Sequence, residues 1–185
     1  NEYCKKQNTK NDPNNICTHC YSWTMLKTFR KNMAPALERN SILLNSKILH
    51  LDALPVINQA FFRFNSHGEL ALDKKKATIN LINYINIAIK NPHCNFALWT
   101  KRFDIIKPYF DKNKKPKNFI LVYSNPKINH IFKKPPKHFD RTFNNVYENI
   151  EVDKQNCTGQ KCKDCLLCYK LDTTDTIVEK VKSYG

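Results

Sequence analysis

Four of the eight cysteines lie close together near the end of the chain, in the segment NCTGQKCKDCLLCYK. They are Cys157, Cys162, Cys165 and Cys168, and two residues separate each of the last three from the next. Such short gaps let neighbouring thiolates converge on one metal centre. The segment is rich in Lys, Asp and Gln, which argues against four buried, apolar thiols. The sequence therefore predicts a metal site in this segment.

The spacing of these cysteines also bears on which metal they bind. Four Cys ligands satisfy either a zinc ion or an iron–sulfur cluster. The run Cys-x2-Cys-x2-Cys resembles the ferredoxin type of arrangement more than the paired Cys-x2-Cys knuckles of a zinc ribbon. We therefore expect an iron–sulfur cluster and keep zinc as the alternative.

A second group of cysteines lies near the start of the chain. Cys17 and Cys20 form a Cys-x2-Cys pair, and Cys4 precedes them across a polar stretch that could fold back. Three thiols can bind three irons of a [4Fe–4S] cluster and leave the fourth iron open for chemistry. Two alternatives stay open. The pair could share one cluster with the C-terminal cysteines, or form a small zinc site with His19 or Cys4.

Other kinds of site find little support in the composition. The one cysteine outside these two groups, Cys94 in NPHCNF, is most simply a buried core thiol. The chain has only three glycines, which excludes a glycine-rich phosphate-binding loop. No Ser–His–Asp or paired-carboxylate pattern stands out.

The elements that must position these residues alternate between short apolar runs and longer amphipathic ones, which is typical of an α/β protein. We expect strands at 60–64, 95–100, 118–124 and 145–152. We expect helices at 21–33, 35–49 with Pro35 in the first turn, 75–90, and 102–110, the last broken near Pro108. Strands separated by helices pair in parallel, so the predicted fold is a parallel α/β layer or a partial (β/α) barrel.

Polar residues follow three of the predicted strands. Ligands of α/β sheets bind beyond the carboxyl ends of the strands, at the rim where we also expect the cysteine-rich loops. A glycine directly after a buried strand suggests a backbone position that excludes a side chain, although an ordinary polar turn is the alternative. The residues at this rim either line a pocket or cap the next helices: Asn65, Gly68 and Glu69, then Thr100 and Lys101, then Ser124 and Asn125.

The motifs ICTHCYS, before a helix, and FNSHGEL, after a strand, together resemble the layout of radical S-adenosylmethionine enzymes. In that family the cluster loop ends in Cys-x2-Cys beside an aromatic residue, here Tyr21, and the next strand is followed by a Gly-Gly-Glu-Pro-like segment. The resemblance implies a [4Fe–4S] cluster on the N-terminal cysteines. It also implies that Gly68 and Glu69 meet the amino group of S-adenosylmethionine, in a cofactor site that includes Asn65, Lys101 and Ser124.

The whole chain, including the C-terminal cysteine run and FALWTKR, is also similar to the phage family of gene product 88 proteins. That family carries no settled activity to transfer. A phage- or bacterium-encoded origin would imply the host cytoplasm, and no stretch is apolar enough for a membrane span. We expect one domain, with an N-terminal Cys loop at 1–22, a β/α core at 23–152, and a C-terminal Cys-rich segment and helix at 153–185.

The formal net charge of +15 normally points to nucleic acid or another polyanion. However, 26 Lys accompany only five Arg, whereas phosphate-binding surfaces often favour the bidentate Arg side chain. We therefore interpret the Lys runs at 74–76, 112–117 and 133–137 as solvated surface. Weak nucleic-acid binding through this surface is the alternative.

Three hypotheses follow. The first is an iron–sulfur enzyme of the radical S-adenosylmethionine type, acting on a small-molecule or macromolecular substrate. The second is a non-catalytic iron–sulfur protein with a structural, electron-transfer or sensing role. The third is a basic nucleic-acid-binding protein stapled by zinc.

Overall fold

A parallel β-sheet forms the centre of the protein. The structure is a computed structural model that describes residues 1–147, 149, 155–171 and 174–181. The five strands are β1 (Phe61–Phe64), β2 (Asn95–Thr100), β3 (Phe119–Ile128), β4 (Arg141–Val146) and β5 (Thr176–Lys180). Every neighbouring pair is parallel, and the order β1-β2-β3-β4-β5 follows the chain. The carboxyl ends of all five strands therefore lie along one edge, which we call the carboxyl edge.

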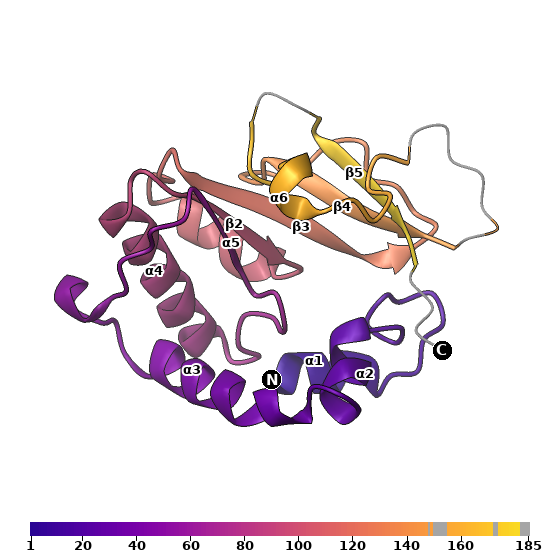
Figure 1. Cartoon of the computed structure of the whole chain (residues 1–185), viewed down its shortest axis with the longest axis horizontal. Coiled ribbons are helices and arrows are strands. Elements are labelled where there is room, and N and C mark those ends of the chain that lie inside the picture. The colour runs from indigo at the N-terminus through magenta and orange to yellow at the C-terminus, as the bar shows by residue number, and fades with distance from the viewer. Residues whose placement is uncertain (148, 150–154, 172–173, 182–185) are drawn as a thin grey trace.

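Helices surround this sheet unevenly (Figure 1). They are α1 (Glu2–Asn8), α2 (Tyr21–Lys27), α3 (Ala34–Ser46), α4 (Lys74–Lys90), α5 (Phe103–Phe110) and α6 (Cys162–Cys165), with 3-10 turns at Lys31–Met33 and Leu51–Ala53. Helix α4 connects β1 to β2, and α5 connects β2 to β3. Within the described residues, the strand–helix alternation stops at β3, because no helix lies between β3 and β4.

The two faces of the sheet carry different covers, because successive residues of a strand point to opposite faces. On the first face, Phe96, Leu98 and Leu121 pack with the buried residues of α4 and α5. On the second face, a smaller cluster packs against Cys157 and Cys168: it consists of Ile120, Val122, Phe143 and Ile177. In Figure 1, α6 lies on the side of the strands away from α1, α2 and α3. The C-terminal cysteine segment is therefore the cover of the second face.

The structure confirms the α/β class, the first three strands and the four predicted helical regions, with changes in extent. Pro35 lies in the first turn of α3, as expected. The N-terminal helix is shorter than predicted, because α2 ends at Lys27. The predicted break at Pro108 is wrong, since α5 continues to Phe110.

The fourth strand was placed too late in the sequence. It was expected at 145–152, but β4 is Arg141–Val146, and residues 148 and 150–152 lie outside the described part of the chain. All six residues of β4 are buried, although Thr142, Asn144 and Asn145 are polar. The side chains of Thr142 and Asn144 are hydrogen-bonded, for example Asn144 Nδ2 to Thr142 Oγ1 at 3.1 Å. A strand without an apolar run gives no hydropathy signal.

The C-terminal part also differs from its prediction. A helix was expected after the cysteines, whereas the structure has strand β5, and α6 is one short turn between Cys162 and Cys165. The predicted boundary at 152–153 lies outside the described residues. Strand β5 pairs along its whole length with β4, which gives the segment its strand geometry.

Asn83 connects α4 to the end of α3 and to the residues just after α3 through three hydrogen bonds. Its Nδ2 donates to the carbonyl oxygens of Leu44 and Lys47, both at 2.9 Å, and its Oδ1 accepts from Leu49 N at 2.9 Å. The side chain is fully buried, and an unsatisfied buried polar group costs about 1–3 kcal/mol. We expect Asn83→Ala to lower the free energy of unfolding by about 3 kcal/mol in urea denaturation.

Asn113→Ala is the matched control for this variant. Asn113 is exposed and makes one bond, from its Nδ2 to Tyr109 O at 2.8 Å. Its loss should change the free energy of unfolding by less than about 1 kcal/mol. Equal effects of the two substitutions would contradict the role given to Asn83.

Candidate functional site

The N-terminal segment is fixed to the carboxyl edge by backbone hydrogen bonds. Ile16 N donates to Pro126 O at 2.9 Å, and Ile128 N donates to Asn14 O at 2.8 Å. Asn15 and Lys127 form an antiparallel bridge beside them. The residues that precede Cys17 therefore pair like a short strand with the end of β3. This pairing fixes the position of Cys17.

Helices α1 and α2 attach to the loop that follows β1. Tyr21 Oη donates to Ser66 O at 2.9 Å, and Ser22 Oγ lies 2.7 Å from His67 Nδ1. Asn1 Nδ2 donates to Glu69 O. These contacts bring α1, which carries Cys4, and the start of α2, which follows Cys20, to the predicted Gly68–Glu69 segment.

The three N-terminal cysteines lie within electrostatic reach of one another. Burial, together with the charges of Glu69, Cys20 and Cys17, raises the pKa of the Cys4 thiol to about 12, while Lys101 opposes the rise. Burial likewise raises the pKa of Cys17, with Cys20 and Glu69 adding to the effect and Lys101 opposing it. Cys4, Cys17 and Cys20 thus lie near one another and near Glu69, and their joint ligation of a metal stays a prediction.

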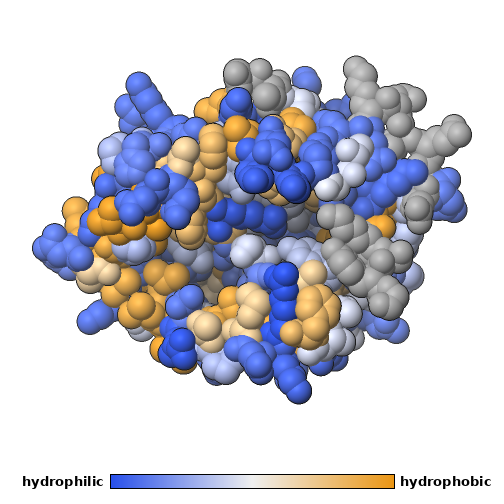
Figure 2. Space-filling model, in the orientation of Figure 1, coloured by the Kyte–Doolittle hydropathy of each residue, from blue (hydrophilic) through white to orange (hydrophobic). Residues whose placement is uncertain are grey.

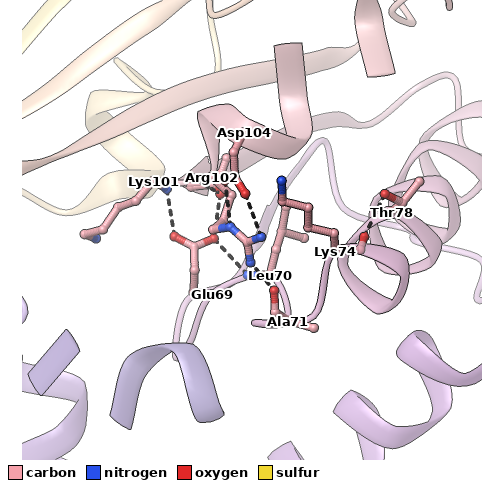
Figure 3. Close-up of polar contacts among 9 residues, drawn as sticks. Glu69, Leu70, Ala71, Lys74, Thr78, Lys101, Arg102 and Asp104 are labelled. Atoms are coloured by element: carbon pink, nitrogen blue, oxygen red, sulfur yellow. Dashed lines mark hydrogen bonds and ion pairs between the residues drawn. The ribbon is translucent and has the colours of Figure 1, made fainter. Parts of the chain in front are cut away.

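Glu69 is a buried carboxylate held by three donors at this edge (Figure 3). Its Oε1 accepts from Thr100 Oγ1 at 2.5 Å and from Leu70 N at 2.8 Å, and its Oε2 accepts from Lys101 N at 2.7 Å. Burial raises its pKa, while the nearby charge of Lys101 and the three hydrogen bonds oppose that rise. Oε2, with one donor, keeps capacity for a further one.

Lys101 supplies the positive charge of the site. Its Nζ donates to Ser124 Oγ at 3.0 Å, so two of the predicted rim residues are in direct contact. Next to it, Arg102 is buried and binds Asp104 in a bidentate pair, through Nε at 2.8 Å and Nη2 at 2.9 Å. Arg102 also donates to the carbonyl of Ala71, which ties the loop after β1 to the start of α5.

Asn65 and Gly68 begin and shape the loop after β1. Asn65 has a φ of 54°, its Oδ1 accepts from Tyr84 Oη at 2.9 Å, and its buried Nδ2 has no partner among the described residues. Gly68 has a φ of 133°, a conformation open essentially to glycine, but a Cβ there would meet nothing within 4 Å. The need for glycine therefore comes from backbone conformation and not from a crowded ligand site.

The two remaining rim residues serve the scaffold. Thr100 is fully buried, donates to Glu69 and accepts from Arg102 N at 3.0 Å, so it links two charged residues. Asn125 is also fully buried, and its Nδ2 donates to Asn144 Oδ1 at 3.1 Å. The capping and packing explanation thus holds for these two residues, and they do not line an open pocket.

The raised pKa of Glu69 predicts a specific pH dependence. The ordinary pKa is 4.5 and the folded value is higher, so between the two the folded protein holds a proton that the unfolded chain has released. The free energy of unfolding of the wild type, relative to Glu69→Gln, should therefore fall as pH rises through this window. The slope is at most about 1.4 kcal/mol per pH unit for one proton.

Urea denaturation of both proteins at a series of pH values measures this slope. Glu38→Gln, at an exposed position of α3, is the control and should track the wild type. A constant difference between wild type and Glu69→Gln at all pH values would show that Glu69 does not titrate as its burial predicts.

The four C-terminal cysteines form a second group. The pKa of Cys168 is raised to about 12, mainly by burial, with Cys157, Cys162 and Cys165 adding to the rise and Arg63 of β1 opposing it. Cys157 is fixed by its N–H, which donates to Val178 O at 3.1 Å, and Gln160 Nε2 donates to Cys165 Sγ at 3.4 Å. We call Cys157, Cys162, Cys165 and Cys168 the quartet, and Cys4, Cys17 and Cys20 the trio.

The two groups lie on different parts of the molecule. The trio is at the carboxyl edge, whereas the quartet lies over the second face of the sheet, and Figure 1 shows α6 well apart from α1 and α2. The expectation that all cysteine-rich loops meet at one rim is therefore wrong for the quartet. All eight cysteines are free thiols, and Cys94 is buried in the core, as predicted.

No group of three or more His, Cys, Asp or Glu side chains that could hold a metal ion occurs in the described parts of the chain. The thiols of each group are thus neighbours but not a formed coordination shell. No helix within these parts has the length and apolar character that crossing a membrane requires.

Three residues at these sites were not identified from sequence. Arg102 and Tyr3 lie beside the trio, with the guanidinium carbon of Arg102 5.2 Å from the centroid of the Tyr3 ring. Arg63 lies beside the quartet. The available signal for the two arginines was their scarcity: Arg is used only five times against 26 Lys, and three of the five, including Arg63 and Arg102, lie in or next to strands.

The fold and the site together define a parallel α/β protein with two separate cysteine groups. A family model for gene product 88 matches residues 1–171, so the chain belongs to the gene product 88 family. This match confirms the family resemblance and supports a phage origin. No curated protein and no solved structure matches the chain.

Proposed function

We propose that this protein binds iron–sulfur clusters, and that the trio holds a [4Fe–4S] cluster with one open iron while the quartet holds a second cluster. The observation that carries the proposal is the convergence of three thiols from separate segments. Cys4 comes from α1, and Cys17 and Cys20 from the loop before α2, yet the three interact electrostatically beside Glu69 and Lys101.

The donor set of the trio suits a thiolate-bound cluster. Its members bind different irons of one cluster, so they need not surround a single ion. Metal binding requires thiolates, and a bound cation favours that form, which offsets the raised pKa of Cys4 and Cys17. Binding of the cluster would require the three cysteine side chains to turn toward one centre. Helix α1 and the segment after Asn15 hold the backbone of these cysteines.

The residues around the trio suit a zwitterionic ligand such as S-adenosylmethionine. The Glu69 carboxylate can accept from its amino group, while Lys101 Nζ and the unpartnered Asn65 Nδ2 can donate to its carboxylate. Seen from the direction of Figure 1, the molecule has a hollow in its middle with hydrophilic residues at the bottom (Figure 2). A reduced cluster would supply the electron for reductive cleavage of S-adenosylmethionine.

We further propose that the sheet is an arc of a (β/α) barrel. The sequential strand order and the helices on the first face support this assignment. The second face would then be the inner face, and the quartet segment covers it. A substrate could approach the trio only from the carboxyl edge.

Anaerobic purification tests the proposal. We expect a brown protein with iron and acid-labile sulfide, which releases 5′-deoxyadenosine when reduced and mixed with S-adenosylmethionine. Clusters without 5′-deoxyadenosine would overturn the open iron and leave a non-catalytic iron–sulfur protein. A colourless protein with stoichiometric zinc would overturn both clusters.

Nucleic-acid binding gains no specific support. Asp111 pairs with Lys107 and Lys137, both at 2.7 Å, and Asp140 pairs with Lys115. These carboxylates offset part of the positive charge of the Lys-rich loops. Retention on duplex or single strands with a steep salt dependence remains the property that this function predicts.

A further inference from the structure

Arg63 is a charged residue inside the second face of the sheet. It lies in β1, directly opposite Ala97 of β2, and Trp99 is two residues beyond that partner on the same face. The guanidinium carbon of Arg63 lies 3.8 Å from the centroid of the Trp99 ring. The ring of Trp99 in turn lies 4.2 Å from that of Phe143. A stacked cation and indole therefore form part of this face.

Both side chains carry a buried donor with no hydrogen-bond partner in the described structure, Arg63 Nε and Trp99 Nε1. Buried N–H groups are nearly always paired, and an unpaired one is costly, more so next to a charge. Two such donors on adjacent strands point to an acceptor that belongs between them.

The quartet lies on the same face. Cys157, Cys168 and Trp99 all pack against the cluster of Ile120, Val122, Phe143 and Ile177. Tyr169, next to Cys168, contacts Phe61 of β1 with ring centroids 5.6 Å apart. Two of the quartet cysteines, Cys157 and Cys168, thus lie on the same face of the sheet as the two unpartnered donors.

We propose that Arg63 and Trp99 donate N–H···S hydrogen bonds to the cluster held by the quartet, and that the charge of Arg63 raises its reduction potential. This inference rests on the proposed second cluster. Four thiolates give such a cluster a net negative charge, which one-electron reduction increases. A fixed guanidinium and two N–H donors stabilise the reduced form more than the oxidised one. The arginine also offsets part of the charge of the four thiolates.

Redox titration of the quartet cluster tests this role. The experiment uses protein in which Cys4, Cys17 and Cys20 are replaced by alanine, so that only the quartet is loaded. In this background, Arg63→Gln should lower the ratio of reduced to oxidised cluster about tenfold at a fixed ambient potential, or 59 mV for one electron. Trp99→Phe, which keeps the ring and loses the N–H, should shift the ratio in the same direction by less.

Two further variants separate charge from structure. Arg63→Lys keeps the charge and should recover part of the shift, and it covers the case in which Arg63→Gln fails to fold. Arg39→Gln removes an exposed charge from α3, on the other side of the molecule, and should leave the potential unchanged. An iron-loaded quartet whose potential is the same in Arg63→Gln overturns this inference alone. A quartet that takes up no iron overturns the proposed second cluster itself.

Discussion

Replacement of Cys4 by alanine is expected to abolish 5′-deoxyadenosine formation and to reduce the iron content to the share held by the quartet. Cys4 is the only thiol of the trio that comes from α1, and the other two lie on the far side of the polar loop. Without it, two thiolates remain for a cluster that needs three to leave a single open iron. Iron analysis and chromatography of the nucleoside product measure the two losses.

Cys94→Ala is the matched control for this substitution. Cys94 is a fully buried thiol at the start of β2, outside both groups, so its variant should keep the iron content and the product. If Cys4→Ala retained wild-type iron and product, the trio would not be the ligand set, and the pair Cys17 and Cys20 would need another partner.

Removal of metal from the quartet is expected to cost several kcal/mol of folding free energy. Metal that binds only the folded chain adds its binding free energy to stability. Here the metal would hold the segment 155–171 over the second face, which would otherwise expose an apolar cluster: Ile120, Val122, Phe143 and Ile177. Urea denaturation with and without a chelator measures the loss, and trypsin should then cleave at Lys161 or Lys163.

Cys165→Ser provides the comparison for chelation. Untreated, this variant should resemble the chelated wild type in stability and in trypsin cleavage, and chelator should change it little. Equal stability of the wild type with and without chelator would mean that side-chain packing alone holds the segment. The contacts of Cys157, Cys168 and Tyr169 with the sheet, and the hydrogen bond from Cys157 N to Val178 O, would then suffice for its attachment.

The first half of the fold was predictable because its signals are local. The repeated isoleucines of α4 and the apolar runs of β1, β2 and β3 follow the periods of their elements. Parallel pairing then placed Glu69, Lys101 and Ser124 at one edge, since their strands end there. The three N-terminal cysteines were singled out by residue type and spacing, and their role as cluster ligands stays a prediction.

The second half was not predictable because tertiary contacts decide it. Strand β4 buries Asn144, whose side-chain amide is hydrogen-bonded to Asn125 and to Ile177 O on neighbouring segments. The path of the quartet across the sheet depends on contacts such as that of Tyr169 with Phe61. From sequence alone, Arg63 would be placed on an exposed face of its strand. Its contact with the ring of Trp99 depends on how β1 and β2 pair. Gly68 was identified from the sequence, but glycine is needed there because of the positive φ and not because a neighbouring atom excludes a Cβ.

The attachment of the N-terminal segment also orders the events of biosynthesis. Tyr147 Oη donates to Pro13 O, a partner 134 positions away, and the pairing with the end of β3 is nearly as distant. Residues 13–16 are synthesised before these partners and therefore have no docking surface until β3 and Tyr147 have been translated. Iron delivered to Cys17 on a nascent chain would meet a flexible thiol pair without Glu69 or Lys101. The proposed cluster of the trio would accordingly be inserted only after the chain has been translated as far as Tyr147.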